Sequence, residues 1–468
     1  MGCFAMAASG TSVELARCNL NSHNCINIER NTHTMVKLDR FDIVLNNPEE
    51  VYFAGQEISG KVVIQTSEDK KVNEILLELK GRARTYWTKH SGKSRIHCSE
   101  STPYFCEQLN THYTHKFVVT AADGKSREKI LPAGLHEVPF SYTLPKTLPS
   151  SFEGEFGFVR YTCKATCERP WDFDIVCRKA FTVVGIEDIN GDAEALAPAS
   201  ISDSNYNIRF CCQRQGTISA EMQIDRSGYT PGEILSVHCK VNNQSQRAIK
   251  VPPILRLKQE VNYKAKTFSG SECARKTSRN VLSIEKNEIP ADSQLEWDEK
   301  LVLPSLAPRL SKCSTMKLTY ILELVIDTKL TLALPIMIGT IPLLSDIVLR
   351  VKQDRKGSNG TVPVDANGVE TSPLIDNNES SSVVQVTITD ESGNIIEDTD
   401  QLSAEMENML SSKKRVRMPS SILSELYPSL PSPYYKECHF GRVNISEDKE
   451  SIQYGENMFA PKYPFYTD

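Results

Sequence analysis

The chain has 468 residues, of which 40% are apolar and 24% are charged, and its net charge is −5. This length predicts two or three domains, because a domain commonly has about 150 residues. The 54 basic residues are outnumbered by 59 acidic ones, which argues against a nucleic-acid binder that relies on bulk positive charge. The apolar content argues against disorder along the whole chain.

The first 34 residues are polar and show no periodicity, so we expect a loose extension without a secretion signal. From 35 to 189, short alternating runs are separated by Gly and Pro turns, as in Phe158–Cys167. A strand is also expected over 116–120. A run of period-two segments without an amphipathic helix predicts an all-β sandwich.

The acidic, Ala/Pro-containing run 190–204 is predicted to be a linker, and the alternating pattern resumes over 205–350. Both halves place a glycine turn before an outgoing strand, at Ala54–Glu57 and at Thr230–Glu233, which indicates two related sandwiches in tandem. The most apolar stretch, within 329–346, is shorter than the roughly 20 residues that cross a bilayer. It contains Pro335 and Pro342, so it predicts strands joined by a turn.

Catalytic and metal-binding signatures are not recognisable in the chain. The 14 cysteines include no C-x-x-C pair and suggest reduced, structural thiols in a cytosolic protein. The sequence contains no Gly-x-Ser-x-Gly elbow and no His-Glu-x-x-His pair. We therefore predict a protein that is not an enzyme, with no catalytic residues, no cofactor and no metal site.

The composition changes after residue 350. The stretch 351–412 has twelve acidic and three basic residues, which predicts a disordered tail over 351–468. Near its end, Pro433 and Tyr435, and again Pro461 and Tyr463, form Pro-x-Tyr motifs. A polyproline-II segment with Tyr two places after Pro is a ligand type of WW domains. Ser432 and Ala460 replace the first proline of the strong form, which is expected to weaken each site by about 1 kcal/mol, or about fivefold.

Two weaker sorting signals lie in the same tail. Glu370 with Leu374 and Ile375 fits an acidic dileucine signal, and Tyr427 with Leu430 fits a tyrosine signal. Both patterns are short, and chance matches to them are frequent. If they act, clathrin adaptors are the expected partners.

Several longer motifs resemble the α-arrestins, the arrestin-domain-containing proteins. Ser151–Tyr161 followed by Arg169-Pro170-Trp171 is similar to their N-terminal sandwich. Ile224–Glu233, Asn242–Ser245 and Pro335–Leu343 are similar to parts of their C-terminal sandwich. The match runs in order over about 36–350. It implies two tandem arrestin-type (immunoglobulin-like) β-sandwiches.

The resemblance also implies a function. Family members are adaptors that recruit a WW-domain HECT-type ubiquitin ligase through tail motifs and present membrane receptors or transporters for ubiquitination, endocytosis and endosomal sorting. We then expect a cytoplasmic protein recruited to plasma membrane and endosomes, with peripheral membrane contact only and no nucleic-acid partner. A branch of the family binds thioredoxin through a cysteine near Asn243, but Ser245 stands at about that place here. The alternative hypothesis is a retromer-like sorting scaffold that works without a ligase.

Overall fold

Strands with alternating burial build the first half of the protein. The computed structural model describes residues 38–92, 94–120, 124, 127–208, 214–327, 330–345, 421–428, 430–446 and 452–466. In the first half, the elements are β1 (Arg40–Leu45), β2 (Val51–Phe53), β3 (Glu57–Thr66), β4 (Lys70–Lys71), β5 (Glu74–Ser91), β6 (Ser94–Asn110), the 3-10 helix η1 (Tyr113–Phe117), β7 (Val118–Thr120), β8 (Arg127–Leu131), β9 (Gly134–Thr143), β10 (Phe152–Glu153), β11 (Gly157–Glu168) and β12 (Ile175–Val184). One sheet has the order β1-β3-β9, and the other includes β6-β5-β11-β12-β2.

The inner faces of these two sheets form the first hydrophobic core. Every second residue of β11 is buried, including Tyr161, whose hydroxyl donates to the Pro149 carbonyl at 2.7 Å. Gly81 on β5 faces the same region, where an added Cβ would lie 2.6 Å from the rings of both Phe105 and Tyr161. The backbone can therefore come this close to two aromatic rings only because residue 81 is glycine.

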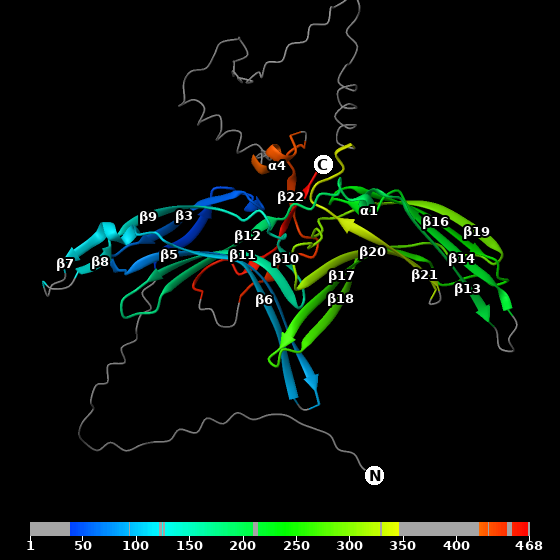
Figure 1. The fold of residues 1–468 in the computed structure, drawn as a ribbon, viewed down its shortest axis with the longest axis horizontal. Helices are drawn as coiled ribbons and strands as arrows, with labels where there is room; N and C mark the ends of the chain where they lie inside the picture. The colour runs from blue at the N-terminus through cyan, green and yellow to red at the C-terminus, as the bar shows by residue number, and fades with distance from the viewer. Residues whose placement is uncertain are drawn as a thin grey trace, which may run out of the picture. The chain divides into compact units, whose positions relative to one another are not determined.

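The second half repeats the architecture. Its elements are α1 (Ala193–Leu196), β13 (Ala199–Ile208), β14 (Arg214–Ile224), β15 (Gly228–Tyr229), β16 (Ile234–Asn243), β17 (Ile254–Thr267), β18 (Glu272–Glu285), β19 (Ser293–Val302), β20 (Met316–Ile326) and β21 (Leu330–Ile338). Strands β13, β14, β16 and β19 run side by side in one antiparallel sheet (Figure 1). The opposing sheet has the order β15-β21-β20-β17, with β18 paired to β17.

Hydrogen bonding links the halves directly. Strand β17 pairs with β6 at Lys266–Ser99 and Thr267–Cys98, so the two larger sheets are continuous. The described residues from Asp39 onward form one compact unit. A pair of immunoglobulin-like sandwiches in one all-β chain is the fold class that the sequence predicts, and this prediction is confirmed.

Three predictions about segments need correction or limits. The predicted linker 190–204 already contains α1 and the start of β13, because Ala199 pairs with Ile224 of the second sandwich. The strand predicted over 116–120 is shortened to β7 by the preceding 3-10 helix. The apolar stretch forms β21 as expected, and no helix of the described residues is long and apolar enough to cross a membrane. Residues 1–34 and 351–420 lie outside the described residues.

Candidate functional site: the docked C-terminal segment

Residues 421–466, called the C-terminal segment below, fold onto both sandwiches. The segment contains α4 (Ser421–Leu426), β22 (Tyr434–Glu437), β23 (Val443–Asn444), β24 (Tyr454–Gly455), β25 (Met458–Phe459) and β26 (Lys462–Phe465). Strand β22 pairs with β26, and β23 pairs with β25. The prediction of a disordered tail over 351–468 is therefore wrong for the described part of this segment. Aromatic side chains and strand pairing give it a structure that the acidic composition of 351–412 did not suggest.

Both Pro-x-Tyr motifs lie at the β22–β26 pair, with each tyrosine in a strand and each proline directly before it. Tyr435 is directly opposite Pro464, and Tyr463 is directly opposite Lys436. Tyr463 is 0% exposed, and its hydroxyl donates to the Ser151 carbonyl at 2.9 Å. Burial holds the pKa of the Tyr463 phenol well above its usual value. A WW domain could not reach this side chain while it occupies the core of the sandwich.

The first motif is less deeply buried but is also engaged. Pro433 is buried and Tyr435 is half-buried. Tyr435 packs with Tyr427 and Leu430 against a small apolar cluster formed by Val51, Phe53, Val184, Ile341 and Leu423. Burial raises the pKa of the Tyr435 phenol, and Glu49 adds to the effect. Tyr435 thus packs in one apolar layer with Tyr427 and Leu430, whereas Tyr463 lies on the opposite face of the β22–β26 pair, against Ser151.

The residues of the tyrosine sorting signal have structural contacts in this layer. The Tyr427 hydroxyl donates to Asp188 Oδ2 at 2.9 Å, and the Leu430 amide donates to the Tyr427 carbonyl at 3.0 Å. Burial, followed by the Asp188 carboxylate, raises the pKa of Tyr427 to about 12. The other signal, Glu370, Leu374 and Ile375, lies outside the described residues.

Two arginines hold the middle of the segment. Arg160 binds Glu153 through two hydrogen bonds of 2.8 Å, and both side chains are largely buried. Arg160 Nη1 and Arg178 Nη2 also donate to the carbonyl of Ile445, at 3.3 and 3.0 Å. The Ile445 side chain is 1% exposed. A buried carbonyl that accepts from two guanidinium groups is a strong anchor, because charged donors form stronger hydrogen bonds than neutral ones.

The segment also adds a short strand to the first sandwich. Strand β24 pairs in parallel with β12, with Gly455 opposite Arg178. Gly455 has a φ of +101°, and an added Cβ would lie 2.0 Å from the Arg178 carbonyl oxygen. Any other residue at 455 would therefore push β24 away from β12. The ring of Tyr454 packs edge-on against Phe41, with the centroids 6.0 Å apart.

Contacts with the second sandwich complete the docking. Ser305 Oγ donates to the Lys436 carbonyl at 2.8 Å, and the His439 amide donates to the Ser305 carbonyl at the same distance. The Tyr466 hydroxyl donates to the Thr340 carbonyl at 2.9 Å. Because the segment holds on to both sandwiches, its release would remove several bridges between them.

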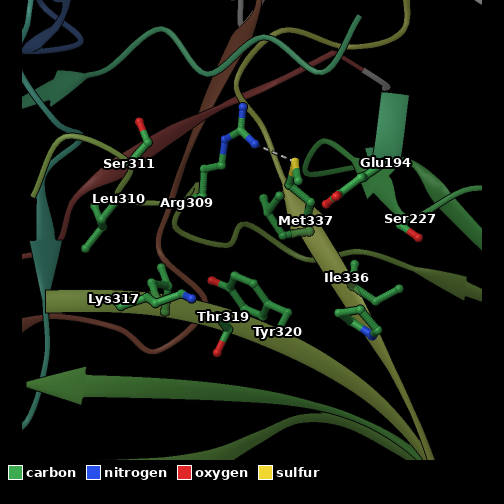
Figure 2. A pocket seen from close by; sticks show the side chains of 13 residues that line it. Glu194, Ser227, Arg309, Leu310, Ser311, Lys317, Thr319, Tyr320, Ile336 and Met337 are labelled. Carbon is green, nitrogen blue, oxygen red and sulfur yellow. Dashed lines mark hydrogen bonds between the residues drawn. The ribbon is translucent and has the colours of Figure 1, made fainter. Parts of the chain in front are cut away.

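A polar cluster joins Arg309 of the second sandwich to Glu187, which follows the first, and a cavity lies beside it in the second sandwich. Arg309 Nε lies 2.7 Å from Glu187 Oε2, and Arg309 Nη1 lies 2.9 Å from Asp192 Oδ2. Ser311 Oγ donates to the other Glu187 oxygen. Figure 2 shows Arg309 and Met337 beside a cavity of about 320 Å³, which is lined mainly by Leu310, Leu318, Tyr320, Ile336 and other apolar side chains of the second sandwich.

Comparison with known proteins identifies the family. The model described as "Arrestin (or S-antigen), N-terminal domain" matches residues 41–190, and "Arrestin (or S-antigen), C-terminal domain" matches 214–343. The chain is also 58% identical over 436 residues to "Arrestin domain-containing protein 17" of Caenorhabditis elegans, an alignment that covers 93% of this chain and all of that protein. The chain belongs to the α-arrestin family.

More distant relatives of this α-arrestin match a smaller share of the chain. "Arrestin domain-containing protein 4" of Mus musculus is 26% identical over 297 residues, covering 62% of this chain and 69% of that protein. "Thioredoxin-interacting protein" of Mus musculus is 26% identical over 313 residues, covering 65% of this chain and 74% of that protein. The nematode alignment is long enough to extend into the C-terminal tail, since only 350 residues precede that tail.

Ser245 has a structural place in this α-arrestin. Its hydroxyl donates to Asn243 Oδ1 at 2.6 Å, and the side chain is 2% exposed. Two of the buried cysteines, Cys167 and Cys177, have pKa values raised to about 12, chiefly by burial. The described cysteines are free thiols, and those that are buried behave as small apolar side chains rather than nucleophiles.

Sequence reasoning missed the residues that hold the C-terminal segment, namely Arg160, Arg178, Ser305, Gly455 and Thr182, whose Oγ1 accepts from the Lys462 amide. One available signal was the aromatic content of 427–466, which contains Tyr427, Tyr434, Tyr435, Phe440, Tyr454, Phe459, Tyr463, Phe465 and Tyr466. Such a composition differs sharply from that of the acidic stretch before it. It is typical of a segment that can bury apolar surface.

Proposed function

We propose that this α-arrestin is an adaptor that links membrane receptors or transporters to a WW-domain HECT-type ubiquitin ligase, promoting cargo ubiquitination, endocytosis and endosomal sorting. The C-terminal segment would hold its Pro-x-Tyr motifs docked until it detaches. Family membership supports the adaptor role. The observation that supports control by docking is the position of Tyr435 and Tyr463 in the β22–β26 pair, packed on the sandwiches.

Docking and ligase binding exclude each other for a physical reason. A WW domain binds an extended polyproline-II ligand and inserts the Pro and Tyr side chains between its own aromatic residues. Pro461 and Tyr463 are buried, and Tyr463 donates to Ser151. The ligase would therefore bind only the fraction of molecules in which the segment has detached. The apparent dissociation constant is the intrinsic constant divided by that fraction.

The test compares the isolated peptide 428–468 with the full chain in binding to purified WW domains. We expect the peptide to bind more tightly than the full chain, with the ratio of the two dissociation constants giving the docking equilibrium. The peptide with Tyr435→Ala and Tyr463→Ala is the matched control and should not bind. A native peptide that shows no affinity for any WW domain would contradict the ligase function.

The same burial favours a second candidate function, a retromer-like sorting scaffold that works without a ligase. In that case Tyr435 and Tyr463 would be core residues only, and Ser432 and Ala460 would stand where a strong ligase motif has proline because no WW domain binds there. Recruitment to the plasma membrane or endosomes would then depend on the sandwiches. Deletion of 421–468 separates the candidates, since it would abolish ligase recovery from cells only if the adaptor proposal is correct.

In either case we infer peripheral membrane contact and a cytoplasmic pool that is recruited to plasma membrane and endosomes. Clathrin adaptors are proposed partners through Glu370, Leu374 and Ile375. Tyr427 and Leu430 are proposed to act in this way only after release, because both side chains pack in the docked layer.

A further inference from the structure

A group of possible metal ligands lies in the first sandwich, away from the C-terminal segment. The short helix η1 follows β6, and its N-cap residue is His112, while His115 lies within the helix. The His115 amide donates to the His112 carbonyl at 3.2 Å, which closes the first turn and brings the two residues together. The two imidazole rings are accordingly neighbours, with their centroids 5.1 Å apart. Glu74, the first residue of β5, lies against the same turn.

The three side chains have the spacing that a small metal ion needs. One ligand atom from each of Glu74, His112 and His115 lies within 4.8 Å of the other two. Glu74 Oε2 and His115 Nε2 are 3.3 Å apart. Bonds of about 2.0–2.1 Å in a tetrahedral site place two ligand atoms about 3.3 Å apart. One pair therefore already has this separation, and the exposed His112 side chain has a ligand atom within 4.8 Å of both other ligand atoms.

The carboxylate is oriented by its surroundings. Glu74 is 8% exposed, and the Thr114 hydroxyl lies 3.2 Å from its Oε1. This contact leaves Oε2 directed toward the histidines. Metal ligands in proteins are commonly held in this way by a hydrogen bond to the atom that does not bind the ion.

Lys129 occupies the place beside Glu74 Oε2 that a metal ion would take. Its Nζ lies 3.0 Å from Glu74 Oε2, and its side chain is 28% exposed. Burial raises the pKa of Glu74, but Lys129, Thr114 and His115 together outweigh burial and hold it below its usual value. A divalent ion can replace the ammonium group, because the long lysine stem can turn toward solvent.

We propose that Glu74, His112 and His115 form a Zn²⁺ site that fastens η1 to the start of β5. Two imidazoles and one carboxylate are ligands that suit Zn²⁺, and three protein ligands leave a fourth position for water. The site would act as a clamp on the connection between β6 and β7. It is independent of the C-terminal segment and of ligase binding.

The experiment is calorimetric titration of the full chain with Zn²⁺ near neutral pH in the presence of a phosphine reductant. We expect one site, weakened at least about tenfold by His112→Ala with His115→Ala, and weakened similarly by Glu74→Gln. His90→Ala is the matched control, because His90 is exposed on β5 outside the cluster, and it should bind like the wild type. Unchanged affinity in the double histidine variant would overturn the proposal.

Lys129→Met separates a metal site from a structural ion pair. Removal of the competing ammonium should tighten Zn²⁺ binding several-fold, whereas a purely structural role of Glu74 predicts no gain. Co²⁺ provides a spectroscopic readout, since its visible bands report nitrogen and oxygen ligands and a thiolate adds a strong ultraviolet band. A thiolate band would assign binding to cysteines and refute the site. No gain in Lys129→Met would refute it as well.

Discussion

Thr182 and Ser305 hold backbone atoms of the C-terminal segment from opposite sandwiches. Thr182 Oγ1 accepts from the Lys462 amide at 3.1 Å, and Ser305 Oγ donates to the Lys436 carbonyl at 2.8 Å. Neither residue belongs to a Pro-x-Tyr motif. Thr182→Val combined with Ser305→Ala therefore weakens docking and leaves the proposed ligase ligand unchanged.

The expected magnitude follows from the groups left without a partner. Thr182 is 2% exposed, so valine leaves the Lys462 amide buried without an acceptor, which costs about 1–3 kcal/mol. The loss of the Ser305 hydrogen bond costs about 0.5–1.5 kcal/mol. A combined loss of about 3 kcal/mol raises the detached fraction about 150-fold. The apparent dissociation constant for a WW domain should fall by the same factor, down to the limit set by the isolated peptide.

Fluorescence anisotropy with a labelled WW domain measures the affinity, and hydrogen exchange at 434–437 and 462–465 measures detachment. Thr66→Val is the matched control, because Thr66 is also 2% exposed and bonds to the Glu68 carbonyl, away from the segment. It should lower overall stability without changing WW affinity. Faster exchange in the segment with an unchanged dissociation constant would refute the proposal that docking limits ligase binding.

Two further predictions concern pH and the junction between the sandwiches. The phenols of Tyr427 and Tyr463 have raised pKa values in the docked state, so they ionise at a lower pH in the detached segment. Docking should therefore be stable below pH about 10 and weaken above it. A tyrosinate absorbance titration of the full chain, compared with a chain that ends at 420, checks this prediction. Arg309→Met should lower the free energy of unfolding by about 2–3 kcal/mol in a urea titration, because Glu187 is 4% exposed and loses its cation. The exposed Arg442→Met should match the wild type.

The sandwiches could be predicted from the sequence because their signals are local. Alternation along Phe158–Cys167 indicates a strand with one buried face, and the structure buries every second residue there. The turn at Thr230–Glu233 could also be predicted from its glycine. In the structure Gly232 has a φ of +94°, a conformation that favours glycine. By contrast, the linker was misplaced because β13 is mostly polar, and only its pairing with β14 makes it a strand.

The docked segment could not be predicted because its partners are remote. Gly455 pairs with Arg178, and Ile445 accepts from Arg160, in each case across more than 250 residues. A composition average over 351–468 is dominated by acids that lie before 413. The proposed zinc ligands illustrate the same limit, since Glu74 precedes His112 by a whole hairpin and no spacing rule connects them.

The departures from the strong WW motif acquire a second explanation from the docked structure. Ala460 is 7% exposed and Ser432 is half-buried, so the size of each is constrained by packing as well as by any WW domain. A sequence that must satisfy both states cannot be optimal for either. Under the proposed function Tyr463 shows the conflict most directly, because the same ring and hydroxyl would fill the sandwich core in the docked state and a ligase pocket in the detached state. Under the proposed function, binding of the ligase would be coupled to release of the segment without any additional element, and its affinity would report the stability of docking.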